Sequence, residues 1–216
     1  MATLIKNGTL ITASDTFEAD ILIENETISQ IGRNLQHPSA EVVDATGKLI
    51  LPGGIDPHVH LDLPMFDTVS SDDHYTGHKA AAFGGTTTVM DFVPLDSPLP
   101  VGEGPGVREG DFKYSVNLWM KKAAKAAIDY SFHMNLTQFN DKIAKEIPSL
   151  MEMGIQTLKV FTAYNGRLRI DDGSIFKALR IAKENGMLVM AHCENGDVIE
   201  TLITDALMTG HLTPEY

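Results

Sequence analysis

Two histidines separated by one residue, His58 and His60, are the side chains of this sequence best suited to chemistry. They end the stretch 55–60 (IDPHVH), which follows Gly53-Gly54 and predicts a short buried strand. Side chains two residues apart in a strand share a face and lie about 7 Å apart along it, so both imidazoles can bind one divalent metal ion. Two core histidines are the alternative interpretation.

A lysine and a third histidine fall late in two further apolar stretches. Lys159 lies within 157–163 (TLKVFTA), where desolvation favours a neutral, nucleophilic amine unless the head reaches solvent at the strand end. His192 lies near the end of 188–193 (LVMAHC), where a lone histidine is usually a core residue. All these groups lie near the carboxyl ends of predicted barrel strands, where barrel enzymes place their catalytic groups. Their shared position favours a metal-dependent active site.

Two other features compete with this site. His74 and His78 are spaced i,i+4 on a predicted helix, but no glutamate follows the first histidine as it does in HExxH zinc sites. We interpret this pair as a feature of the helix surface. Cys193 has the opposite parity to His192 and is expected to pack toward the helices. As the single cysteine, it allows no internal disulfide and suits a reducing compartment.

The elements that position these groups alternate between strand and helix after Pro52, as in parallel βαβ units. The predicted strands lie near 54–60, 86–93, 128–136, 157–163 and 188–193, and the predicted helices near 72–83, 111–126, 140–152, 173–185 and 196–209. No GxGxxG turn follows the first strand, so an α/β fold with a partial (β/α)8 TIM barrel of about five βα units is favoured. The Gly/Pro-rich stretch 94–110 predicts a flap over the site or a disordered insertion.

Residues 1–52 alternate apolar and polar positions without a helical period. Short apolar runs flank Asn7-Gly8, Asn25-Glu26 and Thr46-Gly47, which predicts hairpins. We therefore expect a small antiparallel β-sandwich module over 1–52, incomplete as it stands, and the first part of the barrel over 53–216.

Composition argues against several classes of function. With 17 basic and 29 acidic residues the formal charge is −12, which disfavours nucleic-acid and anionic-membrane partners. The first residues contain neither an apolar signal segment nor a run that could span a bilayer. A soluble cytoplasmic protein is expected.

Four motifs occur together in this sequence, namely 58–62 (HVHLD), 80–88 (AAAFGGTTT), 158–161 (LKVF) with Tyr164, and 191–194 (AHCE). In combination they resemble the cyclic amidohydrolases, and among them the dihydropyrimidinase and hydantoinase family. The resemblance runs over essentially all 216 residues. It implies a binuclear metal site, usually zinc, and members that are homo-oligomers, often tetramers.

The resemblance also implies roles for individual residues. His58 and His60 match ligands of the first metal, Lys159 the lysine that carries a bridging carbamate (an N6-carboxylated side chain), and His192 a ligand of the second metal. Tyr164 matches a phenol that hydrogen-bonds the oxyanion, with an ordinary strand-end aromatic as the alternative. Phe161 and Met65 are expected to contact the substrate together with Tyr164.

The implied activity is hydrolysis of the ring amide of 5,6-dihydropyrimidines or 5-substituted hydantoins to N-carbamoyl amino acids. Dihydroorotases typically carry an arginine for the substrate carboxylate where this chain has Asp62, and the apolar Leu63, Met65 and Phe66 suit a neutral ring. Allantoinase, a dihydroorotase-like enzyme and a non-catalytic binding or assembly relative are the alternatives. Family members continue for about as long again, so the chain is expected to be an N-terminal fragment that is unstable or self-associating, and inactive, by itself.

Overall fold

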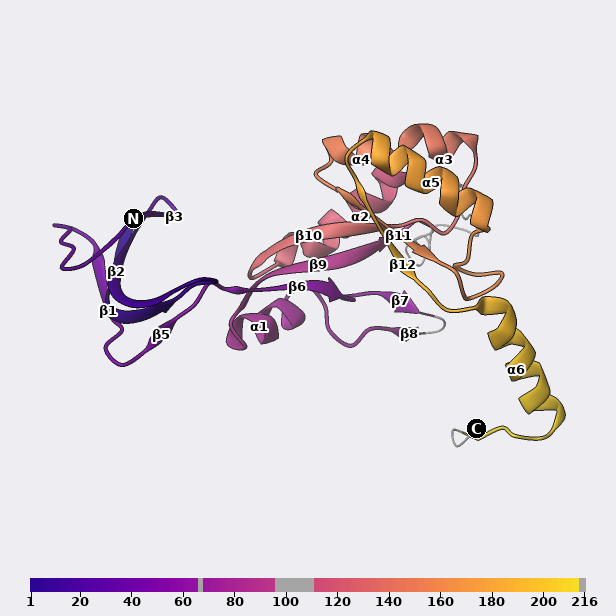
Figure 1. Cartoon of the computed structure of the whole chain (residues 1–216), viewed down its shortest axis with the longest axis horizontal. Helices are drawn as coiled ribbons and strands as arrows, with labels where there is room; N and C mark the ends of the chain where they lie inside the picture. The colour runs from indigo at the N-terminus through magenta and orange to yellow at the C-terminus, as the bar shows by residue number, and fades with distance from the viewer. Residues whose placement is uncertain (66–67, 96–110, 214–216) are drawn as a thin grey trace. The chain divides into compact units, whose positions relative to one another are not determined.

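The computed structural model describes residues 1–65, 68–95 and 111–213, which fall into two compact units, Met1–Gly53 and Gly54–Tyr216 (Figure 1). The flap expected over 94–110 lies, from residue 96 onward, outside the described residues. Within the described ranges, no helix combines the length and apolar character needed to cross a membrane.

The first unit is a five-stranded sheet in which β1 pairs with three other strands. Its strands are β1 (Ala2–Ile11), β2 (Thr16–Glu24), β3 (Thr27–Gly32), β4 (Glu41–Asp44) and β5 (Leu49–Ile50), in the order β3-β2-β1-β4 with β5 also on β1. The predicted hairpin at Asn25-Glu26 is confirmed, because both residues have positive φ, 50° and 64°, and β2 pairs antiparallel with β3.

The other two expected hairpins are wrong. Asn7 has φ 63° but lies inside β1, where the register shifts between Ile5 and Gly8. Its left-handed conformation forms a bulge, and its N–H donates to the Asp20 carboxylate at 2.9 Å. The strands on either side of Thr46-Gly47 do not pair with each other, because β4 and β5 both run parallel to β1. The sheet is therefore mixed rather than antiparallel.

The second unit confirms the predicted partial (β/α)8 barrel. Its five main strands are all parallel, in the order β12-β11-β10-β9-β6. They are β6 (Gly54–Val59), β9 (Thr86–Pro94), β10 (Asp129–Asn135), β11 (Thr157–Phe161) and β12 (Leu188–His192), and a small pair is formed by β7 (Pro64–Met65) and β8 (Thr68–Val69). The helices are α1 (Thr76–Phe83), α2 (Phe112–Lys122), the 3-10 turn η1 (Ala123–Lys125), α3 (Asp141–Glu146), α4 (Ser149–Glu152), α5 (Asp172–Glu184) and α6 (Gly196–Met208).

Four of these helices begin at a short polar side chain that caps the helix. The side chains of Asp111, Asn140, Asp171 and Asn195 each accept a hydrogen bond from a backbone N–H in the first turn of α2, α3, α5 and α6. Such caps satisfy donors that have no partner within the helix. They explain why the predicted starts of these helices lie within a residue of the observed ones.

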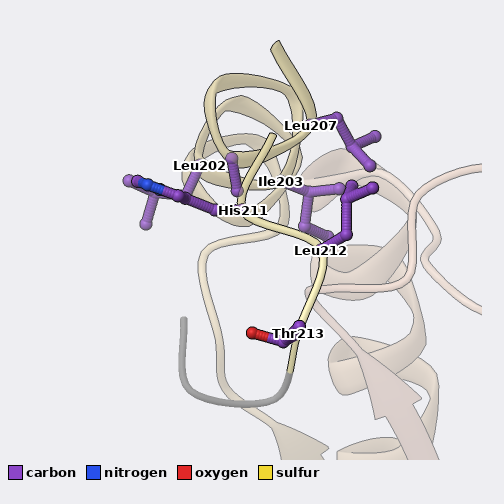
Figure 2. Close-up of a pocket in the computed structure, with 7 residues that line it drawn as sticks. Leu202, Ile203, Leu207, His211, Leu212 and Thr213 are labelled. Carbon is purple, nitrogen blue, oxygen red and sulfur yellow. The ribbon is translucent and has the colours of Figure 1, made fainter. Parts of the chain in front are cut away.

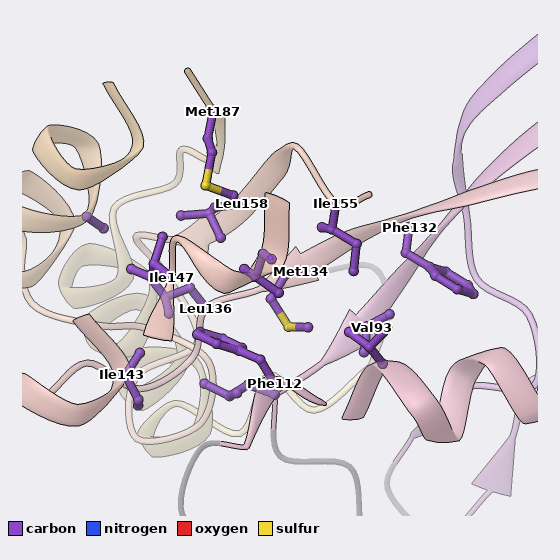
Figure 3. Packing of buried hydrophobic residues seen from close by; sticks show 14 of the residues in the cluster. Val93, Phe112, Phe132, Met134, Leu136, Ile143, Ile147, Ile155, Leu158 and Met187 are labelled. Carbon is purple, nitrogen blue, oxygen red and sulfur yellow. The ribbon is translucent and has the colours of Figure 1, made fainter. Parts of the chain in front are cut away.

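The hydrophobic core of the second unit lies between the parallel sheet and its helices (Figure 3). Alternate strand residues, including Met134, Leu158 and Val160, are fully buried in it. Because strand side chains alternate between faces, Lys159 and Phe161 must point to the opposite, inner face of the sheet. The core packing therefore determines which face carries the chemistry.

Part of the apolar surface of this unit is uncovered within the described residues. A shallow pocket on the face of α6 and the segment after it is lined by Leu202, Ile203, Ala206, Leu207, His211, Leu212 and Thr213 (Figure 2). The edge strands β6 and β12 likewise expose Ile55 and Leu188. These faces have the character of surfaces that another element covers.

Candidate metal centre

The two histidines of the first motif lie side by side at the end of β6. The ring centroids of His58 and His60 are 5.3 Å apart, with the ring planes nearly perpendicular. Burial, reinforced by the nearby positive charges of His58 and Lys159, lowers the pKa of His60 below its usual value. The neutral imidazole is the form that binds a metal ion.

The ring of Phe92 on β9 lies at the centre of this group, although the sequence analysis did not single it out. It is 1% exposed, and its centroid lies 4.5 Å from the ring of His58 and 5.0 Å from that of His60. A further histidine, His133 on β10, lies 4.8 Å from it, and the Lys159 Nζ lies 5.9 Å from its centroid. Phe92 thus gathers groups from β6, β10 and β11 on the inner face.

A second group of predicted residues lies around Phe161. The Lys159 Nζ is 5.4 Å from the Phe161 ring, which is itself 6.1 Å from the rings of both His192 and Tyr164. The rings of Tyr164 and His192 are 5.2 Å apart. Lys159 therefore lies between the β6 histidines and the His192 group. The side chain of Met65 lies outside what the structure describes.

The residues next to His192 include one whose surroundings differ from the expectation. His192 Nε2 itself contacts the Glu194 carboxylate directly. Cys193 is exposed rather than packed under the helices, because it follows the last residue of an edge strand. Parity along the strand indicates its direction but not whether any element covers it.

Among the residues that the structure describes, the donor set reaches three ligands only if the lysine supplies oxygen. Across the described residues, no three His, Cys, Asp or Glu side chains converge on one point. Lys159 makes no ion pair with any described residue and lies between two aromatic rings. Two imidazoles and a carboxylated lysine would complete a three-ligand set of the kind that catalytic metal sites use.

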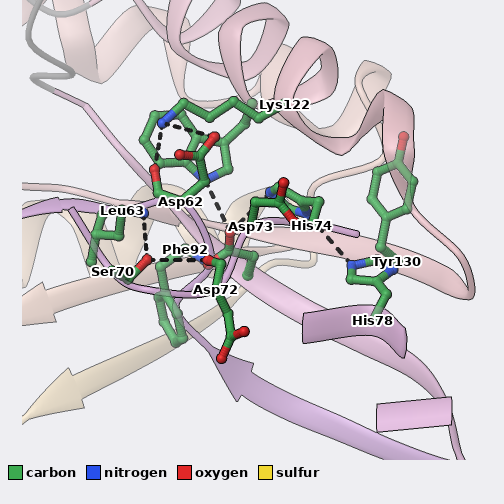
Figure 4. Close-up of polar contacts among 12 residues, drawn as sticks. Asp62, Leu63, Ser70, Asp72, Asp73, His74, His78, Phe92, Lys122 and Tyr130 are labelled. Carbon is green, nitrogen blue, oxygen red and sulfur yellow. Dashed lines mark hydrogen bonds and ion pairs between the residues drawn. The ribbon is translucent and has the colours of Figure 1, made fainter. Parts of the chain in front are cut away.

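The pair His74 and His78 is not a surface feature, so that interpretation is wrong. The two side chains are 1% and 0% exposed, and His74 Nδ1 lies 3.4 Å from His78 Nε2 (Figure 4). His74 Nε2 also lies 3.5 Å from the carboxylate of Asp91, which accepts a hydrogen bond from Trp119 at 3.1 Å. Asp91 lies on β9 one residue before Phe92, so this network occupies the opposite face of the strand from the histidine pair of β6.

Burial shifts the titration of this network in opposite directions. It lowers the pKa of His74 to about 4 and raises that of Asp91 to about 6. At neutral pH the imidazole is therefore uncharged, and its contact with the carboxylate is not an ion pair. The sequence could not indicate this, because the burial of His74 depends on packing against Asp91 of β9 and Tyr130 of β10.

Replacing His74 with phenylalanine is expected to make the complete protein less sensitive to acid. The pKa of His74 is about 4 in the fold and 6.5 for a free side chain, so the unfolded chain binds this proton first as the pH falls. The contribution of the neutral imidazole is present above pH 6.5 and is lost between pH 6.5 and 4. The melting temperature of the variant, relative to wild type, should rise across this window on acidification.

Asp91→Asn provides the matched comparison. The pKa of Asp91 is raised from 3.8 to about 6, so the wild-type carboxyl group stabilises the fold as it is protonated below pH 6. The melting temperature of this variant, relative to wild type, should therefore fall as the pH is lowered. Differences that stay constant from pH 7 to pH 4 in both variants would contradict the assignment.

The carboxylate of Asp62 turns toward a cation of α2. It lies 3.8 Å from the Lys122 Nζ, which also donates a hydrogen bond to the Asp62 carbonyl (Figure 4). The residue has φ 50°, and its N–H donates to the carbonyl of Asp72 at 2.8 Å. Because its charge is paired, repulsion by Asp62 is a weaker argument against a carboxylate substrate than the sequence suggested.

A parallel sheet with histidines and a lysine toward the carboxyl ends of its strands has its reactive groups where barrel enzymes carry their active sites. Residues 49–216 match the model of the amidohydrolase family, and the chain belongs to that family. The D-hydantoinase of Geobacillus stearothermophilus is 47% identical over the whole chain, and the dihydropyrimidinase of Dictyostelium discoideum is 38% identical over 91% of it. The chain covers 44% and 37% of these relatives, less than half of their length.

The chain is also similar to solved structures of these enzymes. A crystal structure of the dihydropyrimidinase from Brevibacillus agri matches 99% of this chain with a TM-score of 0.89 and 47% identity. A crystal structure of a D-hydantoinase also matches 99% of it, with a TM-score of 0.89 and 46% identity. The chain covers 44% and 45% of these two structures. The partial TIM barrel predicted from the sequence is thus confirmed.

Proposed function

We propose that the complete protein hydrolyses the ring amide of 5,6-dihydropyrimidines or 5-substituted hydantoins, giving N-carbamoyl amino acids. The observation that carries this proposal is the grouping of His58, His60 and Lys159 around one buried ring, Phe92. It is found in a chain that is similar over its whole length to D-hydantoinases. The substrate class follows from that similarity and the reaction type from the side chains.

We infer that the site holds two divalent metal ions, of which zinc best suits imidazole ligands with an open position. His58, His60 and Lys159 would hold the first ion, and Lys159 and His192 would contribute to the second. Carboxylation of Lys159 joins its neutral Nζ to the carbon of CO2 with loss of one proton, giving an anion with two oxygens. When bound, the ions would supply a water whose pKa is lowered toward neutrality.

The protein side chains then position the ring and stabilise developing charge. We propose that the phenol of Tyr164, which is 46% exposed, donates a hydrogen bond to the carbonyl oxygen as that oxygen becomes negative. Phe161 lies beside both Tyr164 and Lys159 and offers an apolar wall for the ring. Met65 is proposed to contact the substrate on the strength of the family resemblance alone.

We further infer a homo-oligomer in the cytoplasm. The exposed single cysteine, Cys193, suits a reducing compartment. The exposed apolar side chains of α6 suit coverage by another part of the complete protein or by another subunit.

The test of the substrate class is a direct comparison of four rings. We expect the complete protein to hydrolyse dihydrouracil and hydantoin with a kcat/KM at least about tenfold above that for dihydroorotate or allantoin, a difference of about 1.4 kcal/mol. Activity should be lost on chelation and should return with added zinc. A preference for dihydroorotate, which the pairing of Asp62 with Lys122 leaves open, would contradict the proposal.

A further inference from the structure

The strand that carries the two histidines departs from regular pairing just before His58. Asp56 pairs with Val89 on β9 and Val59 with Asp91, so Pro57 and His58 together lie opposite a single residue, Met90. This is a β-bulge, which bends its strand and changes the direction of the side chains there. The bulge therefore sets the direction in which His58 points.

The two residues of the bulge differ from ordinary strand residues in their backbone hydrogen bonds. Pro57 has no N–H, and the N–H of His58 donates to the side chain of Asp56 at 3.1 Å. The carbonyl of Pro57 instead accepts a hydrogen bond from Nε2 of His133 at 2.9 Å. His133 lies on β10, two strands away in the sheet and 76 residues away in the sequence.

The hydrogen-bond partners of His133 determine which of its two ring nitrogens carries the hydrogen. A carbonyl can only accept, so Nε2 carries the hydrogen, and in the neutral ring Nδ1 accepts from the hydroxyl of Thr157 on β11. The side chain is 3% exposed, and its ring packs against Phe92. One imidazole thus joins β6, β10 and β11 and also supports the ring on which His58 and His60 lie.

We propose that His133 is a positioning residue for the metal-binding histidines, holding the bulge at Pro57 so that His58 and His60 face a common point. It acts through the backbone carbonyl that precedes His58 and through Phe92, and it is not itself a ligand. The inference rests on the proposed function, since it requires that these two histidines bind metal. A packing histidine of the core would have no such effect on the metal.

Two variants separate positioning from packing. His133→Gln keeps an N–H donor at nearly the reach of Nε2, and His133→Met keeps the length and much of the volume but has no donor. His78→Met is the matched control, because His78 is fully buried on the other face of β9 and away from the bulge. Each variant of the complete protein is titrated with Co2+, and its visible spectrum, melting temperature without metal, kcat and KM are measured.

We expect His133→Met to bind Co2+ about tenfold or more weakly than wild type, with a changed Co2+ spectrum, as is typical when support around a metal ligand is lost. His133→Gln should restore most of the affinity and the wild-type spectrum. His78→Met should lower the melting temperature without changing either property. The fall in activity of His133→Met should appear in kcat at subsaturating metal and be offset by excess metal.

Two results with the His133 variants would overturn the inference. One is equal Co2+ affinity and spectra in wild type and His133→Met. The other is a loss of affinity in His133→Gln and His133→Met alike that follows their loss of melting temperature, as it would for simple packing. Wild-type protein that binds Co2+ but hydrolyses none of the four rings would contradict the proposed substrate class alone. Wild-type protein that binds no Co2+ would overturn both proposals.

Discussion

Lys159→Ala is expected to remove most of the bound metal and to lower kcat/KM by on the order of 10³-fold, because metal ions contribute several kcal/mol of transition-state stabilisation. The described part of the chain brings no third His, Cys, Asp or Glu side chain to His58 and His60. Without the lysine, the two imidazoles have no anionic partner there. Metal content is measured per chain after gel filtration, beside the rate of hydantoin hydrolysis.

A short carboxylate should partly reverse this loss. Propionate added with zinc can place two oxygens at the position proposed for the carbamate, in the space left by the shorter alanine side chain. Lys177→Ala serves as the control, because Lys177 is an exposed lysine of α5 and its loss should change neither metal content nor rate. Wild-type metal stoichiometry in Lys159→Ala would falsify the assignment.

Tyr164→Phe is expected to lower kcat by about 10²- to 10³-fold while leaving metal content unchanged, which is the typical effect of losing one oxyanion donor. The substitution keeps the ring that lies 5.2 Å from His192 and 6.1 Å from Phe161, so only the hydroxyl is lost. KM should change little, because the bond forms mainly in the transition state. Steady-state kinetics with the zinc-loaded protein measure both constants.

Tyr75→Phe is the matched control for this prediction. Tyr75 is 49% exposed, close to the 46% of Tyr164, and precedes α1 away from the inner face of the sheet. Loss of the Tyr75 hydroxyl should leave kcat unchanged. If Tyr164→Phe also keeps the wild-type kcat, the phenol does not bind the oxyanion, and the alternative of an ordinary strand-end aromatic is correct.

The strands and helices of the second unit could be predicted because their signals are local. Apolar runs mark β9 to β12, and capping residues such as Asp111 and Asn195 mark where helices begin. The turns of the first unit were harder to predict from the sequence. Asn7 and Asn25 both adopt positive φ, but one forms a bulge and the other a hairpin. The choice depends on distant partners, since Asn7 is held by Asp20.

The candidate site likewise has features that could be predicted from local patterns and features that could not. Parity along a strand predicted that His58 and His60 share a face and that Lys159 lies on the face opposite Leu158. The contact of His133 with Pro57 could not be predicted, because it depends on the register of two strand pairings and on a bulge. Single-sequence patterns carry no information on such register.

The left-handed backbone conformation of Tyr164 affects any attempt to raise the thermostability of this protein. Its φ of 64° is left-handed, a conformation that costs a residue with a bulky side chain on the order of 1 kcal/mol and costs glycine or asparagine much less. Either replacement would relax the turn, yet would delete the phenol proposed for catalysis. A library sorted only for protein that stays folded after heating would enrich these replacements. Its most thermostable variants would then lack the phenol and lose catalytic activity.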